Sequence, residues 1–196
     1  MTRRRGPGRW ASFIAFSAVL AASAGTASQK PAGQPANPEA LVLVDFRKRI
    51  DAYMDVHAEV NKGTAKQEET NHPEKIREAQ LALAERIRAA RANARPGDIF
   101  TPEIRSAFRR LMYPELRGAE GRETKSTIKE DAPKGVPLKV NAAYPEGTSL
   151  PTVPPNLLAA LPQLPEDLEY RIIDKHLILR DVDANLIVDF IPNAIR

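Results

Sequence analysis

The sequence predicts an α+β protein, with helices in the first two thirds of the chain and a small antiparallel sheet after them. Apolar residues recur every three or four positions between residues 38 and 112, which is the spacing of amphipathic helices. Eight prolines fall within residues 133–165, and they exclude long helices from that segment. Three short runs rich in β-branched and aromatic residues follow between residues 168 and 191, and such runs are typical of strands.

Residues 1–27 are typical of a secretory signal peptide. Four arginines precede an uncharged, mainly apolar stretch, and small residues then offer a cleavage site between Ala27 and Ser28. The alternative is a retained membrane anchor, but the uncharged run is only just long enough and its small residues reduce its hydrophobicity. We therefore expect an exported protein, periplasmic or secreted, with no transmembrane segment after signal cleavage.

The signal peptide also accounts for the formal charge of +4. Residues 1–27 contain four arginines and no acidic residue, so the remaining chain has 25 basic and 25 acidic residues and a formal charge of zero. The net charge of the exported chain thus gives no reason to expect nucleic acid as a partner. The absence of cysteine from the sequence excludes disulfides, a thiol nucleophile and thiolate metal ligands.

Residues 28–37, which contain two prolines and a glycine, are expected to form a flexible linker. A helical region should then cover residues 38–131. The pair Asn37-Pro38 is a helix start, because asparagine caps the first turn and proline suits the first helical position. This first helix should run to about Asn61.

The second helix should run from Pro73 to about Ala94, and a third should begin at Pro102. The connection of about ten residues between the first two helices favours an antiparallel helical hairpin. Residues 115–131 are mostly polar and are the candidate for a fourth helix. Two glycines in this segment would make that helix less stable.

Residues 132–196 are expected to form a proline-rich connection and a β-meander of three to four strands, in one domain with the helices. The segments LEYRIID, HLILRDV and LIVDFI predict three antiparallel strands; residues 137–144 are the candidate for a fourth, and residues 154–161 for a short helix. Strict alternation predicts that Arg171, Arg180 and Asp189 face solvent. The residues expected to face the core are Tyr170, Ile172, Leu177, Leu179, Val188 and Phe190.

The C-terminal segment LPQLPEDLEYRIIDKHLILRDVDANLIVDFIPNAI resembles that of exported bacterial proteins of acidobacterial type that have no assigned function. The segments GDIFTPE, at residues 97–103, and VNAAYPEG, at residues 140–147, are similar to segments of the same group. This resemblance implies no activity. Over about the last 30 residues the chain is also distantly similar to the small β-meander of periplasmic nickel/cobalt-homeostasis regulator-type proteins, which implies a structural likeness and no metal function.

No motif for catalysis, cofactor binding or metal binding is present in the sequence. His57, His72 and His176 lack metal-ligand spacing, and there is no phosphate-binding loop, nucleophile elbow or dinucleotide fingerprint. We therefore expect no catalytic residue, no cofactor and no metal, and a protein that is not an enzyme. The alternative is an enzyme of unknown class with a composite site near His57, assembled with Asp55 or Glu59.

The strongest charged feature of the chain lies between residues 86 and 110. This window contains seven arginines and two acidic residues, so its net charge is +5. Such a window could bind an anionic surface, either a lipid or a polyanion. The candidate residues are Arg86, Arg88, Arg91, Arg95, Arg105, Arg109 and Arg110. The alternative is that these arginines lie on solvated helix faces, since arginine is a good helix former and residues on two helices need not share a face.

These features together predict a non-enzymatic interaction module of the periplasm or envelope. An anionic-surface binder that uses residues 86–110 is the first alternative, and the enzyme near His57 is the second. The expected partner is an envelope protein or an anionic surface rather than nucleic acid, and the open edges of the sheet could accept a partner strand. The oligomeric state stays open.

Overall fold

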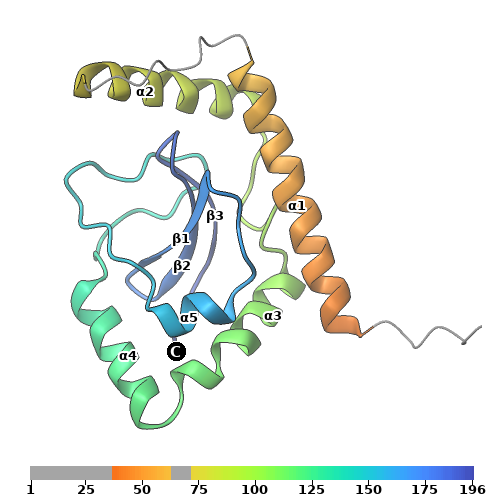
Figure 1. Cartoon of the computed structure of the whole chain (residues 1–196), viewed down its shortest axis with the longest axis vertical. Coiled ribbons are helices and arrows are strands. Elements are labelled where there is room, and N and C mark those ends of the chain that lie inside the picture. The colour runs from red at the N-terminus through yellow and green to blue at the C-terminus, as the bar shows by residue number, and fades with distance from the viewer. Residues whose placement is uncertain (1–36, 63–71) are drawn as a thin grey trace, which may run out of the picture. The chain divides into compact units, whose positions relative to one another are not determined.

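The computed structural model describes residues 37–62 and 72–196, and it confirms the α+β class (Figure 1). The predicted signal peptide with its cleavage site at Ala27 and Ser28, and nearly all of the linker, lie outside the described residues. In chain order the elements are α1 (Pro38–Asn61), α2 (Pro73–Ala90), α3 (Pro102–Met112), the 3-10 helix η1 (Pro114–Leu116), α4 (Gly118–Asp131), α5 (Pro155–Ala160), β1 (Leu168–Ile173), β2 (His176–Asp181) and β3 (Leu186–Ile191).

The helices begin where their capping residues predict. The side chain of Asn37 accepts a hydrogen bond from the main-chain N–H of Glu39 at 3.0 Å, and Pro38 occupies the first turn of α1. Thr101 caps α3 in the same way by accepting from the N–H of Ile104. The second helix ends at Ala90, four residues before its expected end, because the chain turns there to run along the sheet.

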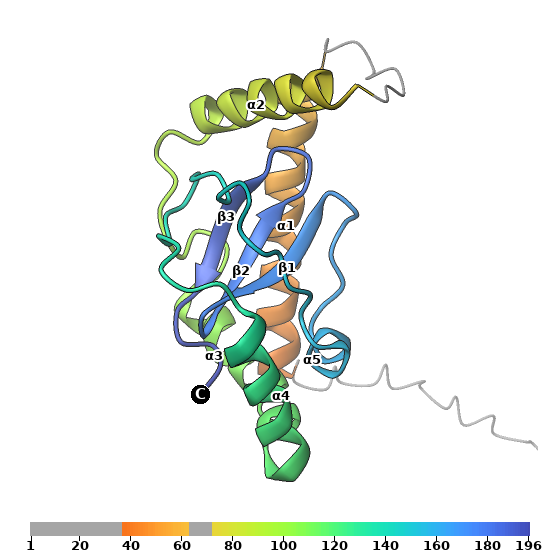
Figure 2. The same cartoon turned by 90° about the vertical axis from the view of Figure 1, so that its left-hand side faces the viewer.

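The first two helices meet at their ends. Figures 1 and 2 show α2 crossing beyond the C-terminal end of α1 instead of running beside it, so the pair does not pack lengthwise as a close antiparallel hairpin. The buried residues of α2 are Leu83, Ala84 and Ile87, all in its second half, while residues 73–78 are exposed. The apolar face of α1 packs in the cluster that also contains the sheet, and the buried residues of α2 join the same cluster.

The three C-terminal strands form the predicted antiparallel meander in the order β1-β2-β3. The turn between β1 and β2 is the expected pair of residues 174 and 175, with Asp174 in the left-handed region at φ 51°. Residues 137–144 do not form a fourth strand and contribute only one bridge, from Ala143 to Leu186. Asn141 has a φ of 62°, which interrupts any extended conformation in that segment.

A β-bulge corrects the predicted orientation of Asp189. Leu179 pairs with Asp189 but Arg180 pairs with Ile187, so Val188 is an extra residue in β3. The bulge breaks the two-residue alternation and turns Asp189 to the helical side, where it is 0% exposed, while Phe190 packs on the opposite face. The prediction that Asp189 faces solvent and Phe190 faces the main core was therefore wrong.

Each face of the sheet has its own apolar cluster. The larger cluster joins the sheet to α1, α2 and α3. It includes the rings of Phe46 and Phe100, which stack, and of Phe108, which meets both of them edge to face, with centroids 4.9–5.8 Å apart. The smaller cluster contains Tyr144 and Ile178, and Val136 and Leu138 pack against it. Because the helices and the meander share the larger cluster, each depends on the other for burial.

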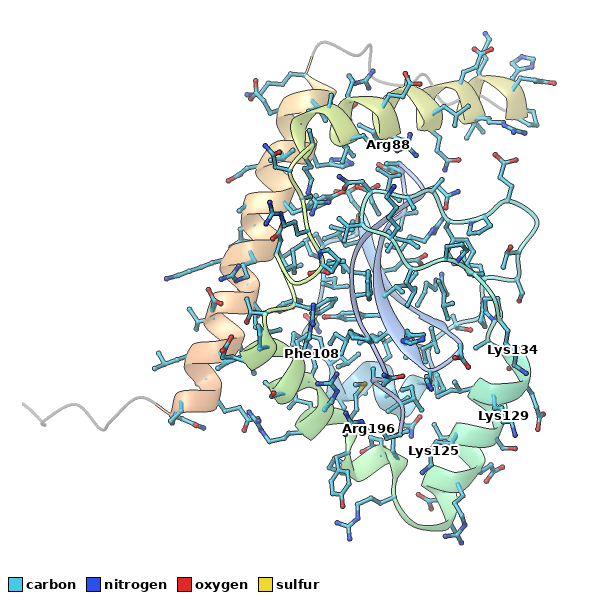
Figure 3. All side chains as sticks on the ribbon, turned by 180° about the vertical axis from the view of Figure 1, so that it is seen from behind. Arg88, Phe108, Lys125, Lys129, Lys134 and Arg196 are labelled. Atoms are coloured by element: carbon cyan, nitrogen blue, oxygen red, sulfur yellow. The ribbon has the colours of Figure 1, made fainter. Side chains whose placement is uncertain are left out.

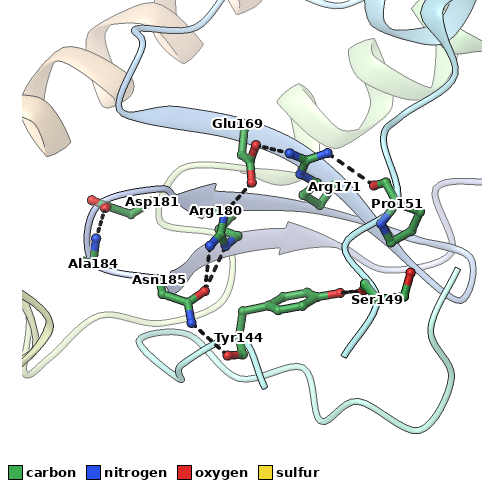
Figure 4. Close-up of polar contacts among 9 residues, drawn as sticks. All are labelled: Tyr144, Ser149, Pro151, Glu169, Arg171, Arg180, Asp181, Ala184 and Asn185. Atoms are coloured by element: carbon green, nitrogen blue, oxygen red, sulfur yellow. Dashed lines mark hydrogen bonds and ion pairs between the residues drawn. The ribbon is translucent and has the colours of Figure 1, made fainter. Parts of the chain in front are cut away.

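The outer face of β1 and β2 also carries a polar network, drawn in Figure 4. Glu169 pairs with both Arg171 and Arg180, and Arg180 donates to the Oδ1 atom of Asn185 at 2.8 and 3.0 Å. Both arginines point to this face as predicted, but their side chains are only 16% and 11% exposed because residues 144–151 cover them. They therefore tie the proline-rich connection to the sheet.

Candidate anion-binding site

The seven arginines predicted to bind anions do not share one surface. Arg88 lies in the last turn of α2, Arg91 directly follows that helix, and Arg109 lies on α3. Arg91 reaches the main-chain oxygen of Val188 near the start of β3, whereas Arg109 donates to the main-chain oxygen of Pro192 just beyond its end. The two groups are thus separated by most of a strand. Figure 3 shows Arg88 and Arg196 at opposite ends of this part of the molecule.

The arginines near α2 form hydrogen bonds within the protein. Arg88 donates to the main-chain oxygen of Asn141 at 3.0 Å, and Arg91 donates to the Oδ1 atom of the same residue at 2.9 Å. The Arg91 guanidinium also lies 4.9 Å from the ring centroid of Tyr53, and burial lowers its pKa. These contacts fix α2 and the connection to the sheet, and they engage donors that an anion would need.

Arg86 and Arg95 also belong to the α2 side. The Nε atom of Arg86 is buried, and the side chain of Arg95 is exposed in the turn after α2, where its main-chain N–H donates to Asp98. On α3, Arg105 lies one turn before Arg109, and Arg110 follows it. Two of the seven predicted residues, Arg109 and Arg110, line a common pocket.

This pocket, which we call the basic pocket, has a volume of about 660 Å³. It lies where α3, η1, α4 and the C-terminal residues meet. Its lining residues are Arg109, Arg110, Tyr113, Leu116, Arg117, Lys125, Ala194 and Arg196. Five of these eight are basic and none is acidic.

Main-chain oxygens hold two of the pocket cations in place. Arg109 donates to the oxygen of Pro192 at 2.8 Å, and Lys125 donates to the oxygen of Arg196 at 3.2 Å. Figure 3 shows Lys125 and Arg196 close together at this end of α4. The carbonyl oxygen of Pro192 is neutral, so it orients Arg109 without cancelling the positive charge of its guanidinium.

Within the part of the chain that the structure describes, the cations that line the pocket form one ion pair. Arg110 lies 3.3 Å from Glu39 of α1, and both side chains are well exposed, so this pair contributes little. Burial lowers the pKa of Arg109, and repulsion from Arg196 and Arg105 lowers it further. The Nε atoms of Arg105 and Arg109 are buried without a hydrogen-bond partner. The region is therefore short of negative charge and of acceptors.

Two glycines allow α4 to approach closely enough to complete the pocket. Gly118 begins α4 with a φ of 68°, a left-handed conformation that glycine adopts without strain. At Gly121 a Cβ atom would lie 2.2 Å from the carbonyl carbon of Leu116. The sequence marks both glycines as weak points of a polar helix, but here they let α4 pack against η1 and carry Lys125 to the pocket.

Sequence reasoning missed three of the pocket residues, which are Arg117, Lys125 and Arg196. Arg196 lies 71 residues beyond Lys125 in the sequence, so no local charge window contains both. A search for local charge finds Arg109 and Arg110 because they are adjacent. The remaining cations are brought to them only by the packing of α4 and of the residues after β3.

The histidine site suggested as an alternative has a different partner from those expected. His57 is 5% exposed, and its Nε2 atom lies 3.5 Å from the Oδ2 atom of Asp181 on β2, instead of beside Asp55 or Glu59. Asp181 also accepts from the Tyr53 hydroxyl at 2.6 Å and from the N–H of Ala184 at 2.7 Å. This buried group anchors α1 to the meander.

The other titratable groups of interest are also engaged. His176 accepts from the N–H of Asn193 through Nδ1 at 3.0 Å, and burial lowers its pKa. Within residues 37–62 and 72–196, no group of three or more His, Asp or Glu side chains is arranged to hold a metal ion. The same ranges contain no helix with the length and apolar character needed to cross a membrane.

Both outer strands of the sheet are partly covered. The segment around Thr152 bridges to Arg171 of β1, and residues 141–143 exchange main-chain hydrogen bonds with Ile187 of β3. This cover reduces the free edge to which a partner strand could add. The basic pocket is therefore a better candidate than the strand edges.

No protein-family model, curated protein or solved structure matches the chain. The resemblances to exported acidobacterial-type proteins and to nickel/cobalt-homeostasis regulator-type proteins stay predictions.

Proposed function

We propose that this chain is an exported, non-enzymatic binding protein that holds an anionic group of its partner in the basic pocket. The supporting observation is a pocket lined by five basic side chains and no acidic side chain, with two of the basic side chains oriented by main-chain oxygens. An anion that entered would accept charge-assisted hydrogen bonds and relieve the repulsion among the cations.

The composition of the pocket favours binding over catalysis. Its lining residues include no histidine, serine, threonine or acidic side chain, and these are common general bases and nucleophiles in enzymes. Arginine and lysine can attract and orient an anion without reacting with it. A ligand with at least two negative charges, such as a phosphate monoester or a diphosphate, suits this number of cations best.

Inorganic pyrophosphate is a simple probe of the pocket. Residues 36–196 form one compact unit that contains the whole described core, so the chain from Ser28 is used for the titration. Arg117→Gln and Lys125→Gln should each weaken binding about tenfold or more, because a hydrogen bond to a charged group contributes about 1.5–3 kcal/mol. Lys48→Gln, an exposed site on α1, makes the same change of charge outside the pocket.

Calorimetric titration at low salt measures these affinities. Binding that weakens in the two pocket variants, stays unchanged in Lys48→Gln and falls with added salt supports the proposal. No binding of pyrophosphate, or an equal loss in all three variants, contradicts it. Circular dichroism of each variant checks that the fold is retained.

The export part of the proposal depends on residues 1–27 and is tested separately. Expression of the full chain in a bacterium with a periplasm, followed by fractionation, should place the protein outside the cytoplasm. N-terminal sequencing of that protein should then begin at Ser28. Retention in the cytoplasm with Met1 intact would contradict export and leave the pocket unaffected.

A further inference from the structure

The mouth of the basic pocket carries an exposed aromatic side chain. Tyr113 lies between α3 and η1 and is 59% exposed, the highest value among the large apolar side chains that the structure describes. The Arg117 guanidinium lies 5.0 Å from the centroid of the Tyr113 ring. An aromatic ring with a cation stacked on it therefore stands at the entrance of a cationic pocket.

The surrounding residues project into solvent. Tyr113, Pro114, Arg117, Gly118 and Ala119 are all exposed, and Figures 1 and 2 show this turn at the end of the molecule that lies away from α2. An exposed tyrosine next to cations suits a membrane interface, where the ring lies at headgroup level and its hydroxyl stays hydrated.

Further cations continue from the pocket along α4. Lys129 follows Lys125 by one helical turn, and Figure 3 shows Lys125, Lys129 and Lys134 following one another along this side of the molecule beside Arg196. The four acidic residues of α4 outnumber its three basic ones, so the pocket itself supplies the attraction; the acidic residues are Glu120, Glu123, Glu130 and Asp131. Each lysine or arginine near an anionic bilayer strengthens binding about fivefold.

We propose that the anionic group bound in the basic pocket is the phosphate of a phospholipid headgroup, and that Tyr113 enters the bilayer interface beside it. This inference rests on the proposed function, because it names the source of the anion. The phosphate accepts from Arg109, Arg117 and Lys125. The glycerol and upper acyl region contact the Tyr113 ring, which a free phosphate in solution would leave exposed.

The chain from Ser28 permits a direct spectroscopic test. The only tryptophan of the sequence is Trp10, so Tyr113→Trp in this chain creates a single fluorescent reporter at the pocket mouth. Vesicles of phosphatidylcholine containing phosphatidylglycerol should shift its emission to shorter wavelength, and vesicles of phosphatidylcholine alone should not. Added salt should reverse the shift.

Co-sedimentation with the same vesicles measures binding in variants. Tyr113→Ala should reduce vesicle binding severalfold and reduce pyrophosphate binding much less, because the ring contacts the bilayer interface and not the phosphate. Lys125→Gln should weaken both. Tyr113→Trp should bind vesicles at least as well as the natural chain, since tryptophan suits the interface equally.

The possible results separate the two proposals. Pyrophosphate binding without vesicle binding, or vesicle binding that Tyr113→Ala does not change, overturns the membrane inference and leaves the anion-binding function standing. Binding of glycerol phosphate in solution as tight as binding to vesicles also overturns it, because a soluble phosphate would then suffice. Loss of binding to both probes removes both proposals.

Discussion

Replacing Asp189 by asparagine should destabilise the fold by at least about 3 kcal/mol. The carboxylate is fully buried and accepts main-chain hydrogen bonds from Gly97, Ile99, Phe100 and Phe190 at 2.8–3.2 Å. It thereby joins β3 to the loop that leads into α3. An asparagine has one oxygen only, so its amide group must face at least some of these donors with hydrogens of its own.

The magnitude follows from the two oxygens. If the asparagine oxygen takes the place of Oδ2, it keeps the bonds from Gly97, Ile99 and Phe100, and the NH2 group faces Phe190 and the second contact from Gly97. Two interactions are then lost at about 1.5–3 kcal/mol each. The reversed orientation sets the amide against three donors and costs more.

Urea unfolding of the chain from Ser28, followed by circular dichroism, measures this loss. Asp183→Asn is the matched control, because it makes the same change in the turn between β2 and β3, where Asp183 is exposed. Burial and the nearby charges of Asp167 and Asp181 raise the pKa of Asp183, so removing its charge should leave stability unchanged or slightly higher. An Asp189→Asn variant within about 1 kcal/mol of the natural chain would refute the reasoning, because the buried carboxylate would then be replaceable.

Three further predictions concern other junctions. Tyr53→Phe should cost about 1.5–3 kcal/mol in the same urea assay, since it removes the 2.6 Å hydrogen bond to buried Asp181; a loss below about 0.5 kcal/mol would count against it. Gly121→Ala should cost about 1–3 kcal/mol and lower the melting temperature, because the new methyl group meets the main chain of Leu116. Burial opposes the ionisation of Glu169, but hydrogen bonds from two arginines hold its pKa below 4.5, so its stabilising effect should be present above that pH and be lost as the pH falls further. Unfolding from pH 7 to pH 3 should show Glu169→Gln less stable than the natural chain at neutral pH, with the gap closing in acid; a pH-independent gap would contradict this.

Local signals were sufficient for most elements. Asn37 and Thr101 mark helix starts because a side chain that caps a helix acts on N–H groups two or three residues away. The meander was equally predictable, since each strand is a short run of β-branched or aromatic residues bounded by turn residues. These signals involve neighbours in sequence, and they do not depend on how distant parts pack.

The errors arose where distant segments meet. Alternation places Asp189 in solvent, but the bulge at Val188 turns it inward to the main-chain donors of residues 97–100. No residue in the strand sequence LIVDFI indicates that a bulge is present. The partner of His57 was missed for the same reason. Asp181 is 124 residues away in the sequence, whereas Asp55 and Glu59 are close to His57 and were therefore expected to be its partners.

The sequence by itself determined the element order, the strand boundaries and the candidate export signal, because periodicity, proline placement and capping act over a few residues. Only the tertiary structure decided which cations act together. It separated Arg88 and Arg91, which bind main-chain and amide oxygens, from Arg109, and it brought Lys125 and Arg196 to the latter. Charges cooperate through distance in space, and the distance between segments is set by packing and not by their order along the chain.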